Sequence, residues 1–366
     1  MLIKQLYIDG IRNLKAIKLQ LDPKVNVFFG LNGSGKSSLL ESIGFLALGR
    51  SFRVNNLDQL ISFDKSYGSV SAVYSNNKEQ QINISTIKYR DKEKINKIGA
   101  SVAGLSAVVD LAPTQIVHEG SSKLIFAEPE GRRKFLDWLV FYANEEYKHL
   151  WRDFNKILYQ RNWLLKQAAF KTGISFKEVN LVFVGLSKKI SNVRENVWQQ
   201  YYACWAECLT HLNLNIDFKP VIQLFSGWKG DLEELLKHNL ERDIHVGYTS
   251  SGPHRADLSF VVKNAAAKNV LSRGQGKFIT LSLIAARARF LEDRLAKTDA
   301  CSVLLIDDLC AEIDSLNGAK IIDFLLNNVG NVQLVITGIQ KGELLQMLGG
   351  VHGRWFGVKD GLILEE

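Results

Sequence analysis

The stretch Gly30-Leu31-Asn32-Gly33-Ser34-Gly35-Lys36-Ser37-Ser38 follows directly on the apolar run Val25-Asn26-Val27-Phe28-Phe29. It fits the pattern G-x-x-x-x-G-K-[ST] in its expected setting, with a strand before it and a helix after it. Glycines allow the backbone N–H groups to turn toward a polyphosphate, and the start of the helix adds the positive end of its dipole. The stretch therefore predicts a nucleotide-binding loop, although a Gly-rich turn with an exposed lysine would have the same letters. The helix has an apolar face made by Leu39, Leu40, Ile43 and Leu46.

Each part of this loop has an expected role. Lys36 would reach the β- and γ-phosphates of the nucleotide, and the Ser37 hydroxyl would hold Mg²⁺. The remaining residues would surround the phosphates with their backbone N–H groups. The residues predicted to bind the nucleotide are Gly30, Asn32, Gly33, Ser34, Gly35, Lys36, Ser37 and Ser38.

The composition excludes several classes of protein. The 366 residues are 46% hydrophobic and 23% charged, enough for one large core or two domains. No apolar run approaches the roughly 20 residues that a bilayer span needs, and Lys4 and Asp9 interrupt the start where a signal peptide would be apolar. We therefore expect a cytoplasmic protein that does not enter a membrane. The cysteines have no spacing typical of a zinc site or a disulfide framework: Cys204, Cys208, Cys301 and Cys310.

The charge balance is basic. The formal net charge is +8 and the pI is near 9.1. This favours a polyanionic partner, of which nucleic acid is the commonest, over a merely basic surface. Residues 88–97 contain five Lys or Arg and an aromatic residue, and they would either contact phosphates or form a solvated hairpin tip.

The N-terminal third has the short, alternating apolar pattern of strands. Residues 2–8, 16–21 and 25–29 predict three strands before the phosphate loop. Residues 69–74 and 81–87 predict a hairpin that turns around Ser75 to Lys78. We expect these antiparallel strands to form a sheet beside a parallel one.

From about Gly131 the apolar residues recur every three or four positions, which predicts long amphipathic helices. They form a predicted helical arm over residues 121–240, inserted into a head made of residues 1–120 and 241–366. The head would contain a helix over 276–295. Its further strands are expected around 243–246 and at 257–262, 303–308 and 332–337.

The strand Val303-Leu304-Leu305-Ile306 ends in two acids, Asp307 and Asp308. A P-loop ATPase needs such a strand beside its phosphate loop. Asp307 would bind Mg²⁺ through its shell, and Asp308 would orient and deprotonate the attacking water. Turn chemistry or helix capping could also explain an Asp pair at this place. Its position downstream of Lys36 in the same chain favours the nucleotide site.

A second motif opens the helix after Leu271. The string Leu271-Ser272-Arg273-Gly274-Gln275 resembles the signature of ABC-type ATPases, although Ser272 could serve only as a helix cap. In that superfamily the signature of one subunit meets the γ-phosphate bound to the other. The resemblance therefore implies that Ser272, Gly274 and Gln275 act in trans, and that ATP holds together a head-to-tail homodimer.

Lys36 and Asp307 lie 271 residues apart, which is too far for a transporter ATPase domain and too near for the long coiled coils of chromosome-structuring proteins. Over essentially the whole chain the sequence resembles the bacterial RecF family of SMC-like ATPases. The resemblance implies an α/β fold with an ABC-type head, which combines a mixed parallel sheet and an antiparallel β subdomain and carries the α-helical arm. The strings that carry it are 2–6 with Asn13, 30–37, 49–53, 132–137, 252–257 and 271–275.

The RecF resemblance also implies a function. Members bind ATP and DNA, hydrolyse ATP slowly in a DNA-dependent way, and help place the RecA recombinase at single-strand gaps and junctions. RecR and RecO are the implied partners, in gap repair, replication and the SOS response. Gln115 resembles the residue that couples Mg²⁺ and the γ-phosphate to the arm. Residues 311–314 resemble the loop that crosses the dimer interface, and Thr337 stands where transporters carry a switch histidine.

Some alternatives remain open at this stage. His254 and Arg255 could contact DNA or brace the head, and a buried pair of Arg255 with Asp257 or with another acid would explain the brace. The rival functions are the ATPase subunit of an ABC transporter, another SMC-like DNA-processing ATPase, and an ATP-dependent nuclease or phage-defence ATPase. Affinity for DNA and association with a membrane subunit would separate the first two from one another.

Overall fold

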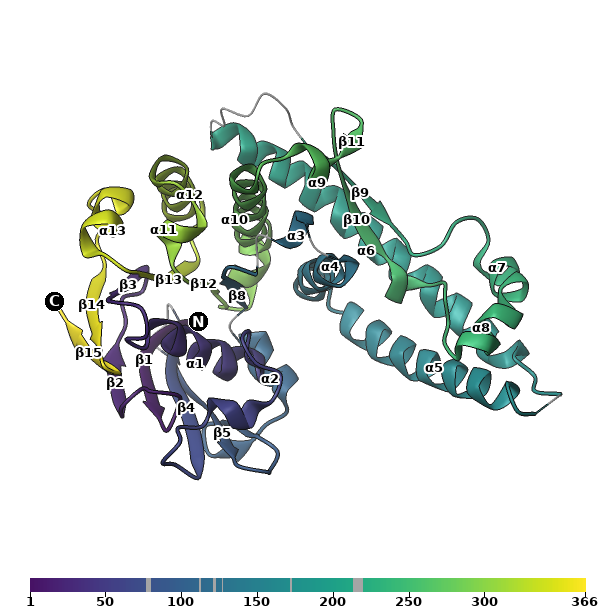
Figure 1. Cartoon of the computed structure of the whole chain (residues 1–366), viewed down its shortest axis with the longest axis horizontal. Coiled ribbons are helices and arrows are strands. Elements are labelled where there is room, and N and C mark those ends of the chain that lie inside the picture. The colour runs from purple at the N-terminus through teal and green to yellow at the C-terminus, as the bar shows by residue number, and fades with distance from the viewer. Residues whose placement is uncertain (77–79, 112, 121–122, 127, 172, 213–219) are drawn as a thin grey trace. The chain divides into compact units, whose positions relative to one another are not determined.

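The computed structural model describes residues 1–366 except 77–79, 112, 121–122, 127, 172 and 213–219 (Figure 1). Two compact units divide the chain: residues 1–122 together with 273–366, and residues 123–272. The second unit is longer than the expected arm. It keeps residues 241–272 because β10 (Asp257–Val262) pairs with β9 (Val221–Phe225) of the same unit. The strand expected at 257–262 thus exists, but it does not belong to the sheets of the first unit.

The first unit is built on a six-stranded sheet in the order β15-β14-β3-β13-β12-β8. Five strands are parallel, and β15 runs antiparallel to β14 at one edge. β12 is buried along its whole length, which confirms the central parallel strand predicted from its uninterrupted apolar run. The strands are β3 (Val25–Phe29), β8 (Thr114–Val117), β12 (Ser302–Ile306), β13 (Val332–Gly338), β14 (Arg354–Lys359) and β15 (Leu362–Glu365).

A second, antiparallel sheet of the first unit has the order β2-β1-β4-β5-β6-β7. It confirms the three N-terminal strands and the predicted hairpin of β4 with β5, although part of the expected turn lies outside the described residues. The strands are β1 (Leu2–Asp9), β2 (Ile17–Gln20), β4 (Tyr67–Ser75), β5 (Gln81–Tyr89), β6 (Ile95–Ile98) and β7 (Ser101–Val102).

Helix α1 (Lys36–Leu48) contacts strands of both sheets and fills the space between them (Figure 1). Its buried Leu39, Leu40 and Ile43 join side chains of both sheets in one core. Because this helix begins at the end of the phosphate loop, the apolar core shared by the two sheets fixes the loop in place. The other helices of the unit are η1 (Leu57–Leu60), α2 (Leu105–Leu111), α10 (Arg273–Lys297), α11 (Leu309–Glu312), α12 (Ser315–Asn328) and α13 (Lys341–Leu348).

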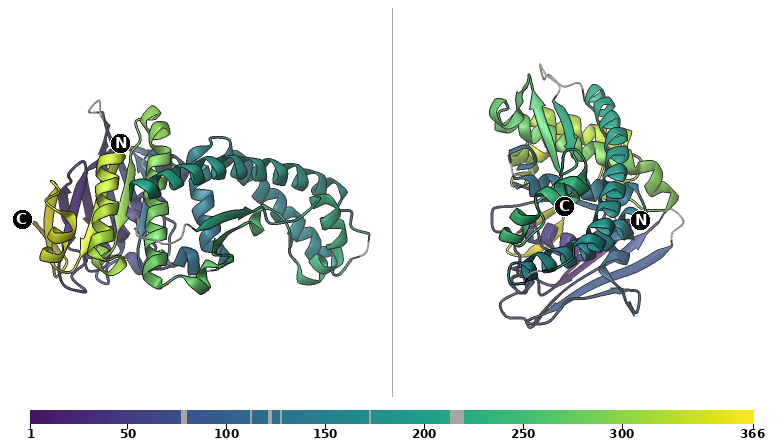
Figure 2. Two further views of the ribbon diagram at one scale, coloured as in Figure 1. Left: turned by 90° about the horizontal axis from the view of Figure 1, so that it is seen from above. Right: turned by 90° about the vertical axis from the view of Figure 1, so that its right-hand side faces the viewer.

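The second unit confirms the two long helices predicted from the apolar spacing, α5 (Tyr147–Ala168) and α6 (Lys177–His211). They pack against each other, and Figure 2 shows α6 running the length of the unit. A three-stranded antiparallel sheet, β11-β10-β9, completes it. Its other elements are α3 (Lys123–Phe126), α4 (Pro129–Ala143), α7 (Leu232–His238), α8 (Leu240–Val246), η2 (Pro253–Arg255), β11 (Ala265–Ala266) and α9 (Ala267–Val270).

The strand predicted around 243–246 is wrong, because these residues form helix α8. Asp243 of this helix is fully buried and forms an ion pair of 2.9 Å with the equally buried Arg161 of α5. Gly247 ends the helix in the left-handed conformation, with φ 73°. The ion pair of the buried Asp243 and the glycine cap both favour a helix here. They outweigh the weak preference for a strand that the alternating Ile244 and Val246 indicate.

The segment 252–257 lies in the second unit rather than in the head. Asp257 pairs with Arg132 at 2.7 and 2.9 Å, so it is not the partner of a buried Arg255. Arg255 is exposed, and its guanidinium lies 5.0 Å from the ring centroid of Tyr248. His254 packs against the rings of Phe154 and Phe183, and its Nε2 lies 2.9 Å from the carbonyl oxygen of Thr249. Burial lowers the pKa of His254 to about 4, which keeps the ring neutral.

Candidate nucleotide-binding site

The phosphate loop connects β3 to α1, as its sequence pattern predicts. At Gly30 the backbone of β14 approaches so closely that a Cβ atom would lie 2.2 Å from the carbonyl oxygen of Val358. Gly35, directly before α1, has φ 120°, and a Cβ there would lie 2.9 Å from Leu14 Cδ2. Both positions therefore require glycine, so the pattern reflects the geometry of this loop.

A side chain from outside the loop holds it in shape. The Nδ2 of Asn13 donates to the carbonyl oxygen of Gly33 at 3.0 Å, and its Oδ1 accepts from the Ser38 hydroxyl at 3.1 Å. On the other side, the N–H of Gly361 donates to the carbonyl oxygen of Ser34 at 2.9 Å. Asn13 thus ties the end of the first strand region to both halves of the loop.

Lys36 lies within the loop it terminates. Its ammonium donates to the carbonyl oxygens of Gly30 at 2.6 Å and Leu31 at 3.0 Å. Burial lowers the pKa of Lys36, and the carboxylates of Asp308 and Asp307 act in the opposite direction. The result is a cation held between loop carbonyls and two acids, where it can exchange the carbonyls for phosphate oxygens.

Asp307 connects the phosphate loop near the N-terminus to the strands near the C-terminus. Its Oδ1 accepts from the hydroxyl of Ser37 at 3.0 Å and from that of Thr337 at 2.9 Å. The same Thr337 oxygen accepts the backbone N–H of Asp308 at 2.8 Å. The sequence predicts that β12 lies directly beside β3, the strand before the phosphate loop. In the structure β13 lies between them. Thr337 at the end of β13 bridges that gap and fixes both acids.

Asp308 has an unusual backbone. Its φ is 49°, a left-handed conformation that a non-glycine residue adopts rarely, and it stands directly before helix α11. Burial raises its pKa, while Lys36 lowers it. A carboxylate with a raised pKa at the end of a buried strand can accept a proton from a bound water.

The side chains around Ser37 suit Mg²⁺. This ion prefers oxygen ligands and usually takes one or two from the protein, with water and substrate phosphates completing the shell. The Ser37 hydroxyl and the Asp307 carboxylate provide two such oxygens at one point. In the described part of the chain, no group of three His, Cys, Asp or Glu side chains forms a metal site of its own.

Gln115 is not brought to these residues. It is buried inside β8, opposite Leu304 in the register with β12, and its Nε2 lies 3.4 Å from the Ser302 hydroxyl at the start of that strand. Asp307 lies at the other end of β12, where its N–H donates to the carbonyl oxygen of Val117. The residue that β8 carries to this edge is therefore His118, whose ring centroid lies 5.1 Å from that of Phe52.

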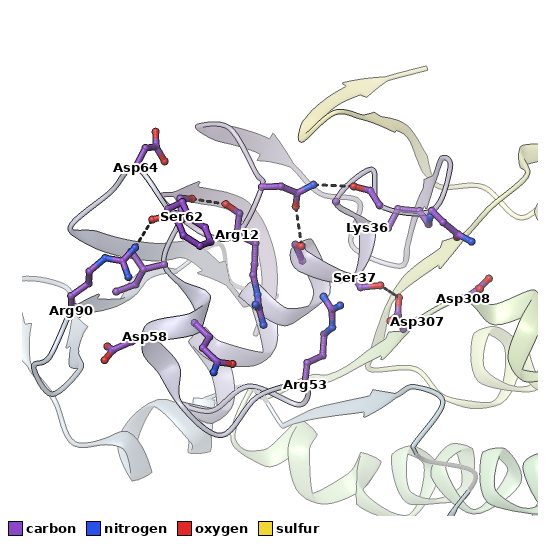
Figure 3. Close-up of a pocket in the computed structure, with 18 residues that line it drawn as sticks. Arg12, Lys36, Ser37, Arg53, Asp58, Ser62, Asp64, Arg90, Asp307 and Asp308 are labelled. Carbon is purple, nitrogen blue, oxygen red and sulfur yellow. Dashed lines mark hydrogen bonds between the residues drawn. The ribbon is translucent and has the colours of Figure 1, made fainter.

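The phosphate loop and the two acids after β12 line a cavity of about 910 Å³ in the first unit (Figure 3). Lys36, Ser37, Asp307 and Asp308 lie at one end of it, and Asp64 and Arg90 at the other. The volume is within the range of small-molecule sites. Its lining is Arg12, Asn13, Asn32, Gly33, Gly35, Lys36, Ser37, Ser38, Arg53, Asp58, Gln59, Ile61, Ser62, Phe63, Asp64, Arg90, Asp307 and Asp308.

Two arginines of this cavity were not identified as site residues from the sequence. Arg12 forms two hydrogen bonds of 3.0 Å with the buried carboxylate of Glu41, and Nη1 of Arg53 lies 3.8 Å from the same group. Glu41 belongs to α1, so the phosphate-loop helix positions both guanidinium groups. Residues 49–53, which include Arg53, are one of the strings that resemble the RecF family, but that resemblance assigned Arg53 no role.

The predicted signature residues lie elsewhere. Ser272 is exposed as the last residue of the second unit, and Gly274 and Gln275 are exposed at the start of α10 in the first. None of the three lines the cavity that contains Lys36. The next turn of α10 contacts the segment after the Asp pair, since Lys277 Nζ donates to the carbonyl oxygen of Ala311 at 2.7 Å.

None of the helices within the described ranges is both long and apolar enough to cross a bilayer.

Comparisons with known proteins place these features in a family. Residues 2–358 match the family RecF/RecN/SMC N terminal domain. A DNA replication and repair protein RecF from Shewanella sp. (strain W3-18-1) is 31% identical over 366 residues, and the match covers 99% of each chain. The same-named protein of Shewanella amazonensis (strain ATCC BAA-1098 / SB2B) is also 31% identical, covering 100% of this chain and 99% of the relative.

Solved structures agree with the sequence comparison. The structure of "the recombination mediator protein RecF-ATP in RecFOR pathway" is 25% identical with a TM-score of 0.86, and the match covers 100% of this chain and 97% of that one. Its counterpart with ATPrS is 26% identical, with a TM-score of 0.83 and coverage of 99% and 97%. An Smc head bound to the C-winged helix domain of ScpA, 17% identical with a TM-score of 0.61, shares the fold. By its sequence and its fold, this chain belongs to the RecF family of SMC-like ATPases.

Proposed function

We propose that this chain is an ATP-binding, DNA-binding protein of recombinational gap repair and replication that hydrolyses ATP slowly. The observation that carries the proposal is the cluster of Lys36, Ser37, Asp307 and Asp308 in one cavity, held by Thr337. A loop for phosphates, a pair of oxygen ligands and a half-buried carboxylate are the parts that nucleotide hydrolysis requires. Relatives named DNA replication and repair protein RecF support the choice of pathway.

The hydrolysis would use this chain's residues in separate roles. Lys36 neutralises the β- and γ-phosphates after its ammonium leaves the Gly30 and Leu31 carbonyls. Ser37 and Asp307 would hold Mg²⁺, which supplies charge neutralisation on the phosphate oxygens. Asp308 orients the attacking water and takes up its proton, which the raised pKa of its carboxyl favours.

The signature would act between two copies of the chain. Gly274 and Gln275 are exposed at the start of a 25-residue helix, outside the cavity of their own unit. Ser272 precedes them and is exposed as well. In a head-to-tail homodimer, these residues would face the γ-phosphate bound by the partner's loop. ATP would then stabilise the dimer by mass action, and hydrolysis would release it.

The proposed partner is DNA in gapped duplex or at single-strand/double-strand junctions, where hydrolysis would be DNA-dependent. RecR and RecO would be protein partners, and RecA would be loaded as a result, within DNA repair, recombination and the SOS response in the cytoplasm. The net charge of +8 supports the polyanionic partner. The family resemblance alone supports RecR, RecO and RecA.

Light scattering with and without DNA tests this function. The unchanged chain should form a dimer with a non-hydrolysable ATP analogue, and the dimer should bind a gapped duplex with an affinity that falls steeply with salt. Lys36→Ala should abolish nucleotide binding and dimerisation, while Lys24→Ala, at an exposed position outside the cavity, should leave both unchanged. A chain that stays monomeric with the analogue, or that binds no DNA, contradicts the proposal.

A further inference from the structure

Helix α5 of the second unit carries two sets of aromatic side chains with opposite surroundings. Tyr147, Trp151 and Phe154 stack in series, with ring centroids 6.0 and 5.4 Å apart, and the first and last of them are buried. Tyr159 and Trp163, farther along the helix, are 74% and 54% exposed. The inner set makes the core of the unit. The outer set contributes little to that core, and its two large rings lie four residues apart on the surface of the helix.

The exposed rings belong to a continuous face of α5. Arg152, Lys156, Tyr159, Trp163 and Lys166 follow one another at alternating steps of four and three residues, and all five are exposed. Residues at these steps lie on one side of a helix. We call these five residues the outer α5 face. It presents two adjacent rings between cations on either side, and none of the five is aliphatic or acidic.

The charge of this helix is far above that of the chain as a whole. α5 contains five Lys or Arg and a single acid, Asp153, a net of +4 within the chain's formal +8. Asp153 lies between Arg152 and Lys156, at 3.5 and 3.6 Å from their nitrogen atoms. Arg161 faces inward, where Asp243 neutralises it. The outer face therefore keeps a positive balance of its own.

A third exposed ring lies beside the same stretch of α5. The backbone N–H and the hydroxyl of Thr249 both donate to Asn162 Oδ1, at 2.8 and 2.7 Å, so the turn at 247–249 is held against the helix. Tyr248 in this turn is partly exposed, and the guanidinium of Arg255 lies 5.0 Å from its ring centroid. This pair adds one more aromatic surface and one more cation next to the outer α5 face.

We propose that the outer α5 face binds single-stranded DNA, with Tyr159 and Trp163 stacking on bases and the flanking cations contacting phosphates. Aromatic rings accept any base by its π-face, and Lys and Arg at the sides neutralise the backbone. A docking site for an apolar protein segment would be expected to offer aliphatic side chains, which this face lacks. The inference rests on the proposed DNA-binding function and deepens it by naming the surface and the strand it takes.

Two pairs of substitutions in the full chain separate stacking from charge. Tyr159→Ala with Trp163→Ala removes the rings, and Leu181→Ala, which is 74% exposed on α6, is the matched control. Lys156→Gln with Lys166→Gln removes two charges, and Lys188→Gln with Lys237→Gln removes two exposed charges elsewhere in the unit. The probes are a fluorescent oligo(dT) of about 20 nucleotides and a blunt duplex of the same length, each titrated at several salt concentrations.

The ring variant should lose about 10-fold or more in affinity for oligo(dT), since one stacked base contributes on the order of 1–3 kcal/mol, and its salt dependence should stay unchanged. Blunt duplex offers no free base faces, so its affinity should change little. For the charge variant, the plot of log affinity against log salt concentration should be less steep. The magnitude of its negative slope should fall by about 1.4, roughly 0.7 for each lost phosphate contact. The two controls should bind like the unchanged chain.

Equal binding of oligo(dT) by the unchanged chain, the ring variant and the charge variant overturns the inference. So does an equal loss by the ring variant on oligo(dT) and duplex, or by Leu181→Ala. Loss of binding to a purified protein partner with DNA binding retained would assign the face to that protein and overturn it too. If the unchanged chain dimerises with the ATP analogue but binds no DNA, the proposed function itself has failed.

Discussion

The hydroxyl of Ser37 donates to Oδ1 of Asp307 at 3.0 Å, although 270 residues separate the two in the sequence. Ser37 is the second residue of α1, and Asp307 directly follows the buried strand β12, which β13 separates from β3. Between these positions the chain builds β4 to β7 of the antiparallel sheet and the whole second unit. The nucleotide site therefore forms only when both ends of the first unit have folded together.

Thr337 is predicted to matter for hydrolysis more than for binding. Thr337→Val keeps the shape of the side chain but removes the donor to Asp307 and the acceptor for the Asp308 N–H. Hydrogen bonds to charged groups contribute about 1.5–3 kcal/mol, so ATP turnover should fall about 10- to 100-fold. Phosphate release measures turnover, and Thr337→Ser, which keeps the hydroxyl, should retain most of it. Unchanged turnover in the valine variant would remove Thr337 from the site.

Asp308→Asn should slow ATP hydrolysis strongly and leave ATP binding in place, because an amide cannot take up a proton from water. The raised pKa of Asp308 adds a dependence on pH. The carboxylate must be ionised to act as a base, so turnover should decline as pH falls, and at a higher pH than an exposed aspartate would give. A profile of turnover against pH for the unchanged chain tests this. A decline only near the ordinary pKa of aspartate, about 4, would contradict the role.

The residues of the nucleotide site could be predicted where a local motif or a periodic pattern in the sequence determines their place in the fold. The phosphate loop, the strand ending at Asp307 and the long helices follow from motifs and periodicity that act within a few residues. Gln115 could not be placed this way, because its depth in β8 depends on the register with β12. The cavity arginines depend on Glu41 in another element, which no local pattern reveals.

Long-range pairs also explain the errors in the second unit. Alternation around 243–246 suggests a strand, but Asp243 is committed to Arg161, 82 residues earlier. Residues 241–272 were placed in the head because a strand signal resumes there. The partner of that strand, β9, has no strong pattern of its own, so the pairing that keeps these residues in the second unit could not be seen.

Breaking the buried pair of Arg161 and Asp243 should destabilise the chain. Both side chains are fully buried, so Arg161→Met leaves an unpaired charge inside the second unit. The expected loss in the free energy of unfolding is about 3–5 kcal/mol. Denaturant unfolding of the full chain measures it. Arg161→Met combined with Asp243→Leu should recover much of the loss, and a double variant as unstable as the single one would count against the unpaired charge as the cause.

His254 should make stability depend on pH. Its folded-state pKa is about 4, below the ordinary 6.5, so the folded state favours the neutral ring. Above pH 6.5 the ring is neutral in both states, and its contribution is complete. As pH falls from 6.5 toward 4, the unfolded state takes up a proton that the folded state does not, and stability falls by up to about 1.4 kcal/mol per pH unit. The difference between the unchanged chain and His254→Gln should therefore shrink over this window, and a constant difference would contradict the buried neutral histidine.

If two copies of this chain share each nucleotide site, two variants that are inactive alone should restore one another when mixed. Lys36→Ala and Ser272→Arg should each abolish ATP-dependent dimerisation and turnover. Neither variant dimerises alone, so the dimers in an equal mixture are mixed ones. Each combines the intact loop of one copy with the intact signature of the other, so up to about half of all sites become functional. Turnover in the mixture should therefore rise to about that share of the unchanged chain's rate. A mixture that stays as inactive as the separate variants would contradict it.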